Sequence, residues 1–267
     1  MGVKYQIVML LSLMKMSIKS SLQYKVSFIF DLLTSVLMFF SEFFVVYLLI
    51  CEVDEIRGWS ADQLAVMYVI TVLAGSIEVF FTDQMRNFSG KILSGKLDLD
   101  LVRPIHPLLR TAGDVSVSGL LNVVLFSGVI LTYLTAAIPG LWTLRDVLLF
   151  ALAVIGGALI FSSITIFSCA FSFWTYDSQF FYRLVKQGTR QMLWYPMNIY
   201  SKGIRFALTF VYPLAFVSYY PAALIFKKDT EYVPAAFGYG SVIIGLALVS
   251  LAVLVWEQGL KRYEGAG

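Results

Sequence analysis

Residues 147–176 read VLLFALAVIGGALIFSSITIFSCAFSFWTY and contain no Asp, Glu, Lys or Arg. A helix needs about 20 apolar residues to cross the hydrocarbon core of a bilayer, so this stretch is long enough to span one. The whole chain agrees, because 59% of its 267 residues are hydrophobic and only 14% are charged. An ordinary soluble domain has about 25% charged residues. The composition therefore argues against a soluble enzyme and against a disordered chain, and it predicts a membrane protein.

Five further stretches are candidates for crossing the membrane. Three carry no charged side chain: 115–144, 206–226 and 232–256. The other two are interrupted by acidic residues, 28–50 by Asp31 and Glu42, and 64–81 by Glu78. We therefore predict an all-α membrane protein, a single transmembrane domain over 1–267 with six transmembrane helices, at 28–50, 64–81, 115–138, 148–175, 204–226 and 236–256.

Basic residues are distributed unevenly over the predicted connections. Fifteen Lys and Arg fall on the side that holds both termini, and four fall on the other side: Arg57, Arg145, Lys227 and Lys228. Cytoplasmic loops carry the excess of Lys and Arg, so both termini are predicted to lie in the cytoplasm. The same count places the connection between the fourth and fifth spans inside, together with Lys202. We expect a multi-pass protein of the cytoplasmic membrane, from a prokaryotic source.

The amino-terminal segment is predicted to be an interfacial helix over 3–24. Lys4, Lys15 and Lys19 fall on one side of such a helix, and most of its apolar residues fall elsewhere. A helix of this kind lies in the membrane interface with its lysines toward water and lipid phosphate. Lysines interrupt the apolar run, and no small-residue cleavage site follows, so a cleavable signal peptide is not expected.

Several site chemistries have no support in the sequence. His106 is the only histidine, and Cys51 and Cys169 are predicted at opposite membrane faces. We find no set of Cys, His, Asp and Glu with the spacing of metal ligands, and no metal site or catalytic site is predicted. The run 90–97 (GKILSGKL) resembles a phosphate-binding loop, but Leu97 stands where that loop needs a Ser or Thr to hold magnesium. No preceding hydrophobic strand is present either, so ATP binding by this run is not expected.

The longest polar connection, 83–114, is predicted on the cytoplasmic side. Its apolar residues recur at helical spacing beside alternating charges, and Pro104 ends the run. One interpretation is a solvated loop with a short helix resting on lipid. The other is a docking helix for a cytosolic partner, because a short helix with apolar contacts and a charged rim suits a groove in another protein. In that case Leu97 and Leu101, four residues apart, would supply the apolar anchor, and Lys96 and Asp98 would be rim charges.

Several short runs, taken together, resemble the permease subunits of type 2 ABC transporters. The first lies in the connection just described: GKLD at 95–98, followed by VRP at 102–104. The others are FWTYDS at 173–178, YPMNIY at 195–200, PLAF at 213–216 and YYPA at 219–222. These runs total 27 of the 267 residues, and their order and spacing match as a set. The length, the six spans and the amphipathic first helix fit the same pattern.

The resemblance implies a membrane subunit without catalysis of its own. It implies two such permeases, as a homodimer or a related heterodimer, above a dimer of separate ABC ATPase subunits. ATP and Mg would bind the partner ATPase, so no cofactor is expected on this chain, and no nucleic acid is expected as a partner. The connection 83–114 would contain the coupling helix that sits in a cleft of the ATPase. The matching residues are Gly95, Lys96, Leu97, Asp98, Leu101, Arg103 and Pro104.

The resemblance also favours export of a substrate by alternating access, and it points to candidate pathway residues. Glu42 lies past the middle of the first predicted span, where an acidic side chain costs around 2.5–3.5 kcal/mol on insertion scales. It is either a carboxylate in the pathway or a hydrogen-bonded residue at a subunit interface. Asp31 and Glu78 are expected near the membrane surfaces. In the fifth span, Pro213 and Pro221 interrupt helical hydrogen bonding, and re-entrant helices could follow from Tyr219 and Tyr220 onward.

The alternative functions would require different sequence features. A secondary transporter or channel subunit that works without ATP is the main alternative, and inverted repeats would favour it. We see no convincing repeat between the first three and the last three spans. An intramembrane enzyme would need a catalytic pair at membrane depth, and few ionisable residues lie within the spans. A purely structural membrane protein remains open, and the sequence does not identify a substrate.

Overall fold

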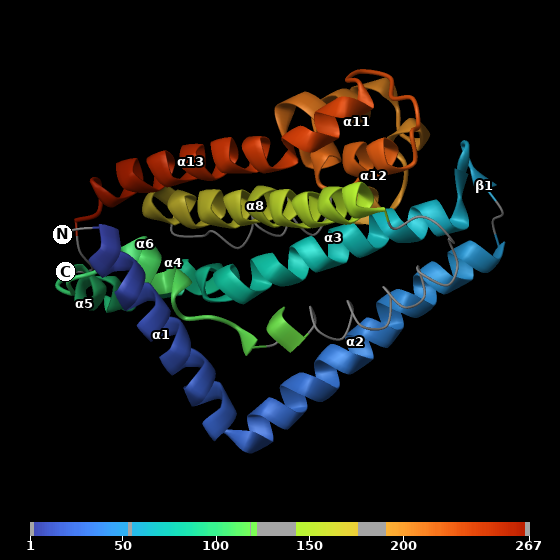
Figure 1. Ribbon diagram of the computed structural model, residues 1–267. Helices are drawn as coiled ribbons and strands as arrows, with labels where there is room; N and C mark the ends of the chain where they lie inside the picture. Colours follow the sequence, from blue (N-terminus) through green and yellow to red (C-terminus); the bar gives the residue numbers. More distant parts are fainter. Residues whose placement is uncertain (1–2, 53–54, 118, 122–142, 176–190, 265–267) are drawn as a thin grey trace.

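The computed structural model describes residues 3–52, 55–117, 119–121, 143–175 and 191–264, and over them the protein is mostly helical (Figure 1). The longer helices are α1 (Val3–Gln23), α2 (Lys25–Glu52), α3 (Ala61–Thr82), α8 (Leu144–Thr175) and α13 (Ser241–Leu260). A two-stranded hairpin, β1 (Glu55–Ile56) and β2 (Trp59–Ser60), joins α2 to α3. Its turn residues Arg57 and Gly58 both have positive φ, as a two-residue hairpin turn requires.

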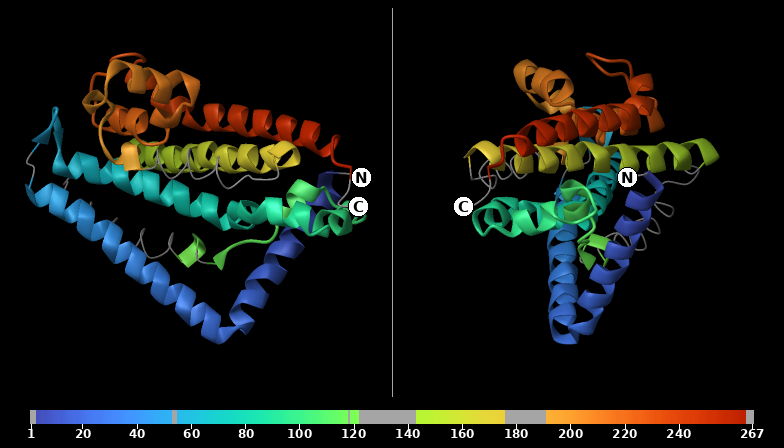
Figure 2. Two further views of the ribbon diagram at one scale, coloured as in Figure 1. Left: turned by 180° about the vertical axis from the view of Figure 1, so that it is seen from behind. Right: turned by 90° about the vertical axis from the view of Figure 1, so that its left-hand side faces the viewer.

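Helix α8 lies between α3 and α13, and all three run in the same direction. Residues of α8 meet residues of α3 in sequence order: Gly157 lies beside Ala74, and Thr165 donates a hydrogen bond to Glu78. Figure 1 and the reverse view in Figure 2 show the three helices side by side, with both chain termini at one end. We call this the termini end, and the end that holds the β-hairpin the far end.

Glycines allow α8 and α13 to approach at backbone distance. A Cβ built on Gly156 would lie 2.6 Å from the carbonyl carbon of Ser241, at the start of α13. A Cβ on Gly245 would lie 2.9 Å from the carbonyl oxygen of Gly156. Small residues at helix contacts bring backbones close and increase van der Waals packing in membranes, where the hydrophobic effect contributes little between helices.

Residues 191–240 form a cap at the far end. Its short elements are η3 (Gln191–Trp194), η4 (Met197–Ile199), α11 (Lys202–Phe206), the π-helical η5 (Ala207–Val211), η6 (Leu214–Phe216), α12 (Tyr219–Ile225) and η7 (Ala235–Gly240). The cap holds Leu193, Leu214 and Val217 fully buried in one cluster with Trp59 of β2. Figure 1 shows α11 and α12 beside the hairpin.

The segment predicted to cross the membrane at 204–226 is not one straight helix. The helical segments 202–211 and 214–225 are bent by 76° at Pro213. Both ends of the segment lie at the far end, since Tyr232 donates to the carbonyl of Lys202 and the ring of Phe226 lies 6.5 Å from that of Trp59. Lys202 therefore lies at the end of the bundle opposite the termini. The charge count had predicted it on the same side as the termini.

Within the described ranges, three helical stretches are long and apolar enough to cross a membrane, 61–93, 144–175 and 235–260, or four if the bent pair counts as one. They contain the predicted spans 64–81, 148–175 and 236–256. The predicted span 28–50 lies within α2, and most of the span at 115–138 lies outside the described residues. Thr175 ends α8 at the termini end, whereas Gln191 belongs to the far-end cap, and the residues between them are not described.

Helices α1 and α2 meet near Tyr24 and diverge as the two arms of a V (Figure 1). The predicted amino-terminal helix is present as α1, and its position in a membrane interface remains a prediction. Large apolar side chains of α2 are exposed, among them Val26, Phe30 and Leu37. The side chain of Glu42, the candidate pathway carboxylate, lies outside the described residues.

Candidate functional site

The connection 83–114 folds into a compact helical subdomain at the termini end. It consists of η1 (Asp83–Asn87), α4 (Phe88–Leu93), α5 (Lys96–Leu101) and α6 (Pro107–Ala112). Gly95 has φ +68° and makes the turn between α4 and α5. This left-handed conformation costs little only for glycine. The turn folds α5 back toward α4 and toward the ends of α8 and α13.

Leu97 faces inward, which contradicts its predicted role as an apolar anchor for a partner. Its side chain is 0% exposed and belongs to a cluster with Phe88 and Ile92 of α4, Leu108 of α6, and Trp256 of α13. It anchors α5 to the bundle instead. Other apolar residues of this region face outward instead of Leu97. Val102 is 83% exposed, Leu93 and Leu99 are each 64% exposed, and Leu101 is 43% exposed.

The other predicted coupling residues line the rim of this surface. Lys96, Asp98, Arg103 and Pro104 are all exposed, and Gly95 is half-buried. Together with Leu99, Leu101 and Val102 they form an exposed surface of apolar side chains edged by charges of both signs. We call this set the α5 surface. Its composition is that of a short helix that docks into a protein groove.

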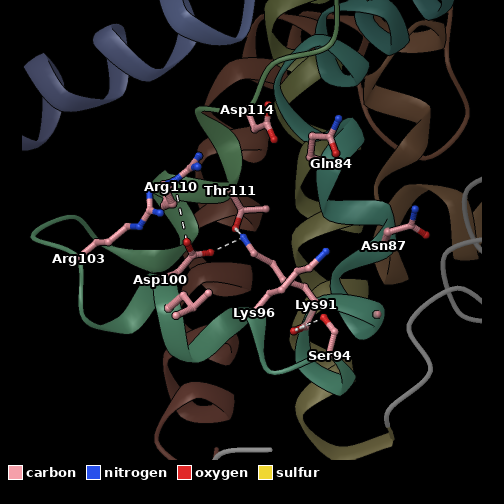
Figure 3. Close-up of a pocket in the computed structure, with 12 residues that line it drawn as sticks. Gln84, Asn87, Lys91, Ser94, Lys96, Asp100, Arg103, Arg110, Thr111 and Asp114 are labelled. Carbon is pink, nitrogen blue, oxygen red and sulfur yellow. Dashed lines mark hydrogen bonds and ion pairs between the residues drawn. The ribbon is translucent and has the colours of Figure 1, made fainter. Parts of the chain in front are cut away.

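Asp100 links three helices of the subdomain and was not singled out from the sequence. It is 6% exposed, forms an ion pair with Lys91 of α4, and has one carboxylate oxygen 3.9 Å from Nε of Arg110 of α6. Lys91 also donates a 3.2 Å hydrogen bond to Thr111 (Figure 3). A buried carboxylate between two cations fixes the relative positions of α4, α5 and α6. In the sequence, the only signal for this role is that Asp100 lies beside other polar residues.

The subdomain is joined to both terminal helices. Nε2 of His106 lies 2.8 Å from Oε1 of Glu257 near the end of α13. The backbone N–H of His106 donates to Gln6 of α1, and the Ser17 hydroxyl of α1 lies 3.0 Å from Asp114. A displacement of the subdomain would therefore be transmitted to α1 and α13 as well as to the adjoining η1 and α3.

The run 90–97 does not form a phosphate-binding loop of the nucleotide-hydrolysing kind. Gly90 and Lys91 lie inside α4, so their backbone N–H groups take part in helical structure and do not surround a ligand. Among the described residues, no group of His, Cys, Asp and Glu could hold a metal ion.

The far-end candidates lie in the cap around a small cavity. Tyr219 and Tyr220 are buried in the cap core, and Pro221 lies in the first turn of α12, where its missing N–H removes no helical bond. Pro213 lies at the bend. The cavity has a volume of about 90 Å³ and is lined by both tyrosines and by Arg205 and Glu231. Arg205 and Glu231 form an ion pair.

Two polar side chains outside the 83–114 subdomain, Glu78 and Tyr200, have hydrogen-bond partners in the structure. Glu78 is fully buried between α3 and α8 and accepts hydrogen bonds from Thr82 and Thr165, and its position near a membrane surface stays a prediction. At the far end, burial and secondarily the neighbouring Tyr195 raise the pKa of Tyr200 to about 12. Its phenol therefore stays protonated and donates to the carbonyl of Met192 at 2.9 Å.

Comparison with known families agrees with this arrangement. The family model of the ABC-2 family transporter protein matches residues 36–267. The chain belongs to this family. No curated protein and no solved structure matches the chain.

The ABC-2 assignment covers all of the described bundle except α1 and the first part of α2. It identifies a multi-pass membrane protein with a role in transport and confirms the resemblance found in the sequence. Permeases of this family are membrane subunits that are generally non-catalytic and normally work with an ATPase partner. The α5 surface is the described feature whose chemistry suits such a partner.

Replacing Asp100 with alanine is expected to loosen the subdomain, because Lys91 and Arg110 would lose their shared carboxylate. Both cations are about a quarter exposed, so we expect a local loss of about 1–3 kcal/mol and not the full cost of a buried unpaired charge. Hydrogen exchange over 88–112 should become faster. Asp98→Ala, at an exposed position two residues earlier, is the matched control and should leave exchange unchanged. Equal protection in the two variants would contradict the structural role of Asp100.

Proposed function

We propose that this chain is the transmembrane subunit of an ATP-driven exporter in the cytoplasmic membrane. Two permeases, identical or related, would form the pathway above two separate ATPase subunits. The observation that carries the proposal is the α5 surface, which exposes Leu99 and Val102 on a subdomain joined to α1, α3 and α13. Short helices of this composition dock into grooves of partner proteins.

The orientation follows from the distribution of basic residues. Eleven Lys and Arg lie in α1, the start of α2, the 83–114 subdomain and the tail: Lys4, Lys15, Lys19, Lys25, Arg86, Lys91, Lys96, Arg103, Arg110, Lys261 and Arg262. Six lie at the far end: Arg57, Arg145, Lys202, Arg205, Lys227 and Lys228. The positive-inside rule places the termini end, and with it the α5 surface, in the cytoplasm.

The mechanism we propose is alternating access driven by the partner. Closure of two ATPases around ATP would move two docked α5 surfaces toward each other. The ion pair of Asp100 with Lys91 and the contact of His106 with Glu257 would pass that movement to the helices as a rigid unit. A ligand can shift an equilibrium between two conformations only by binding one of them better, and here that ligand would be ATP on the partner chain.

Six crossings are part of the proposal. Helices α2, α3, α8 and α13 supply four, and α2 runs opposite to the other three (Figure 2). The predicted span at 115–138 would supply a fifth, and most of it lies outside the described residues. The sixth crossing rests on the resemblance alone. The far-end cap would then be the extracellular part, with α11 and α12 as re-entrant helices. Irregular backbone of this kind is tolerated where protein covers it.

Purification from the native membrane in mild detergent tests the function. An ABC-type ATPase is expected to elute with the tagged permease, and the eluted material is expected to hydrolyse ATP. The chain alone, separated in a stronger detergent, should hydrolyse none. Transport by the purified permease in liposomes that contain no ATPase would contradict the proposal and favour a secondary transporter or channel subunit.

A further inference from the structure

The 83–114 subdomain has an open cavity beside the α5 surface, and Lys96, Leu99 and Arg103 belong to both. Its volume is about 620 Å³, and it opens between η1, α4, α5 and α6 (Figure 3). Four basic side chains line it: Lys91, Lys96, Arg103 and Arg110. Only two acidic residues do so, Asp100 and Asp114. The lining therefore has a formal excess of two positive charges.

The acidic residues are already engaged. Asp100 is paired with Lys91, and Asp114 accepts a hydrogen bond from Ser17 of α1. Neither Lys96 nor Arg103 has an ion-pair partner among the residues that the structure describes. Arg110 is held 3.9 Å from Asp100, and its buried Nε makes no hydrogen bond. Three cations thus line the cavity with hydrogen-bonding capacity that no described partner satisfies.

We propose that this cavity binds a phosphate-bearing anion. Arginine presents its donors in a planar fork that matches phosphate oxygens, and lysine adds a point charge. The Ser94 and Thr111 hydroxyls also line the cavity, but they already donate to the carbonyls of Lys91 and Pro107, so the basic side chains supply the donors. Basic pockets on the cytoplasmic side of membrane helices are suited to anionic lipid headgroups, and a free phosphate offers the same chemistry.

The sequence contains a partial indication of this site. Lys91, Ser94 and Lys96 belong to the run that resembles a phosphate-binding loop, yet the structure uses them differently. They approach the cavity as side chains from α4 and α5, with Arg103 and Arg110 added from later in the chain. Leu97, which stands where such a loop holds its magnesium-binding hydroxyl, is fully buried and does not line the cavity. The proposal is therefore of anion binding and not of nucleotide hydrolysis.

The test uses the full-length protein and two probes. Inorganic phosphate is titrated into detergent-solubilised protein while the unfolding temperature is followed, and lipid retention is measured in nanodiscs that contain phosphatidylglycerol or only phosphatidylcholine. The variant is Lys96→Gln with Arg103→Gln, both at exposed positions. The matched control is Lys261→Gln with Arg262→Gln, which removes the same two residue types at the same end of the molecule but outside the cavity.

We expect the cavity variant to weaken anion binding by about tenfold or more, since each lost charge-assisted hydrogen bond contributes about that much. The control should change it by less than about twofold, because exposed charges away from the site interact weakly with it. A loss for phosphatidylglycerol alone identifies a lipid headgroup, and a loss for phosphate alone identifies a free anion. Absence of binding in the wild type, or equal binding in variant and control, would overturn the proposal. The unliganded unfolding temperature of each variant reports whether it is folded.

Discussion

A Gly156→Ala protein is expected to unfold about 2–10 °C below the wild type. The reason is the contact between the backbones of α8 and α13. A Cβ at Gly156 would lie 2.6 Å from the carbonyl carbon and 2.7 Å from the Cβ of Ser241. Backbone atoms cannot rotate away as a flexible side chain can, so the helices must separate. Overpacking of this kind costs about 1–3 kcal/mol, occasionally more.

Helix propensity acts in the opposite direction and does not reverse the result. Alanine is favoured over glycine inside a helix by about 1 kcal/mol, which offsets part of the strain. Gly240→Ala is the matched control, because the nearest atom to its Cβ would be Cδ1 of Ile244 at 3.9 Å. Thermal unfolding in detergent should leave this control within about 1–2 °C of the wild type. A Gly156→Ala protein as stable as the control would contradict the close approach of α8 and α13.

A protein with Leu99→Asp and Val102→Asp is expected to lose its ATPase partner. Both side chains are exposed, so the change should leave the permease folded, with an unfolding temperature near that of the wild type. In a groove of the partner, however, two carboxylates would replace two apolar contacts and would lose their hydration. We expect the ATPase recovered with the permease to fall by about tenfold or more, since each anchor removed from the centre of an interface typically costs over 1 kcal/mol.

Two controls separate docking from folding. Phe237→Asp places the same charge at an exposed aromatic residue of the far-end cap and should leave ATPase recovery unchanged. Leu97→Ala should act through stability, because this leucine is fully buried and such truncations cost about 2–5 kcal/mol. Full ATPase recovery with the Leu99/Val102 variant would remove the α5 surface from the coupling assignment.

The sequence predicted the long helices of the bundle well and the short ones poorly. The spans at 64–81, 148–175 and 236–256 were recognisable because uninterrupted apolar runs of that length have few alternatives. The close approach of Gly245 to Gly156 was not recognisable, because a small residue at a helix contact does not identify the residue that it meets. Both glycines were identified as contact residues from the structure.

The segment 204–226 illustrates why hydropathy alone was insufficient. It is apolar because Leu208, Leu214 and Phe216 are buried against the rest of the far-end cap, and an apolar composition does not distinguish burial in protein from burial in lipid. Pro213 was the correct local signal for the bend. The position of Leu193 at the far end, where it clusters with Trp59 and its carbonyl accepts a hydrogen bond from Ser218, had no local signal.

At one position of the candidate site, the sequence analysis predicted an outward-facing side chain that the structure buries. Spacing of four residues placed Leu97 and Leu101 on one helical face, and α5 does contain both. Because α5 has only two turns and follows the left-handed Gly95, tertiary packing decides which side faces the bundle, and Leu97 lies on that side. Asp100, which fixes the arrangement, could not be separated from the other acidic residues of the run by sequence alone.

Photo-crosslinking in intact cells tests the central claim most directly. A photoreactive amino acid at Val102, the most exposed of the large apolar residues of the α5 surface, is expected to capture an ABC-type ATPase from the cytoplasm. The same amino acid at Tyr239, exposed in the far-end cap, is expected to capture none. An ATPase captured from Tyr239, or no ATPase captured from Val102 while the transporter is active, would contradict the account.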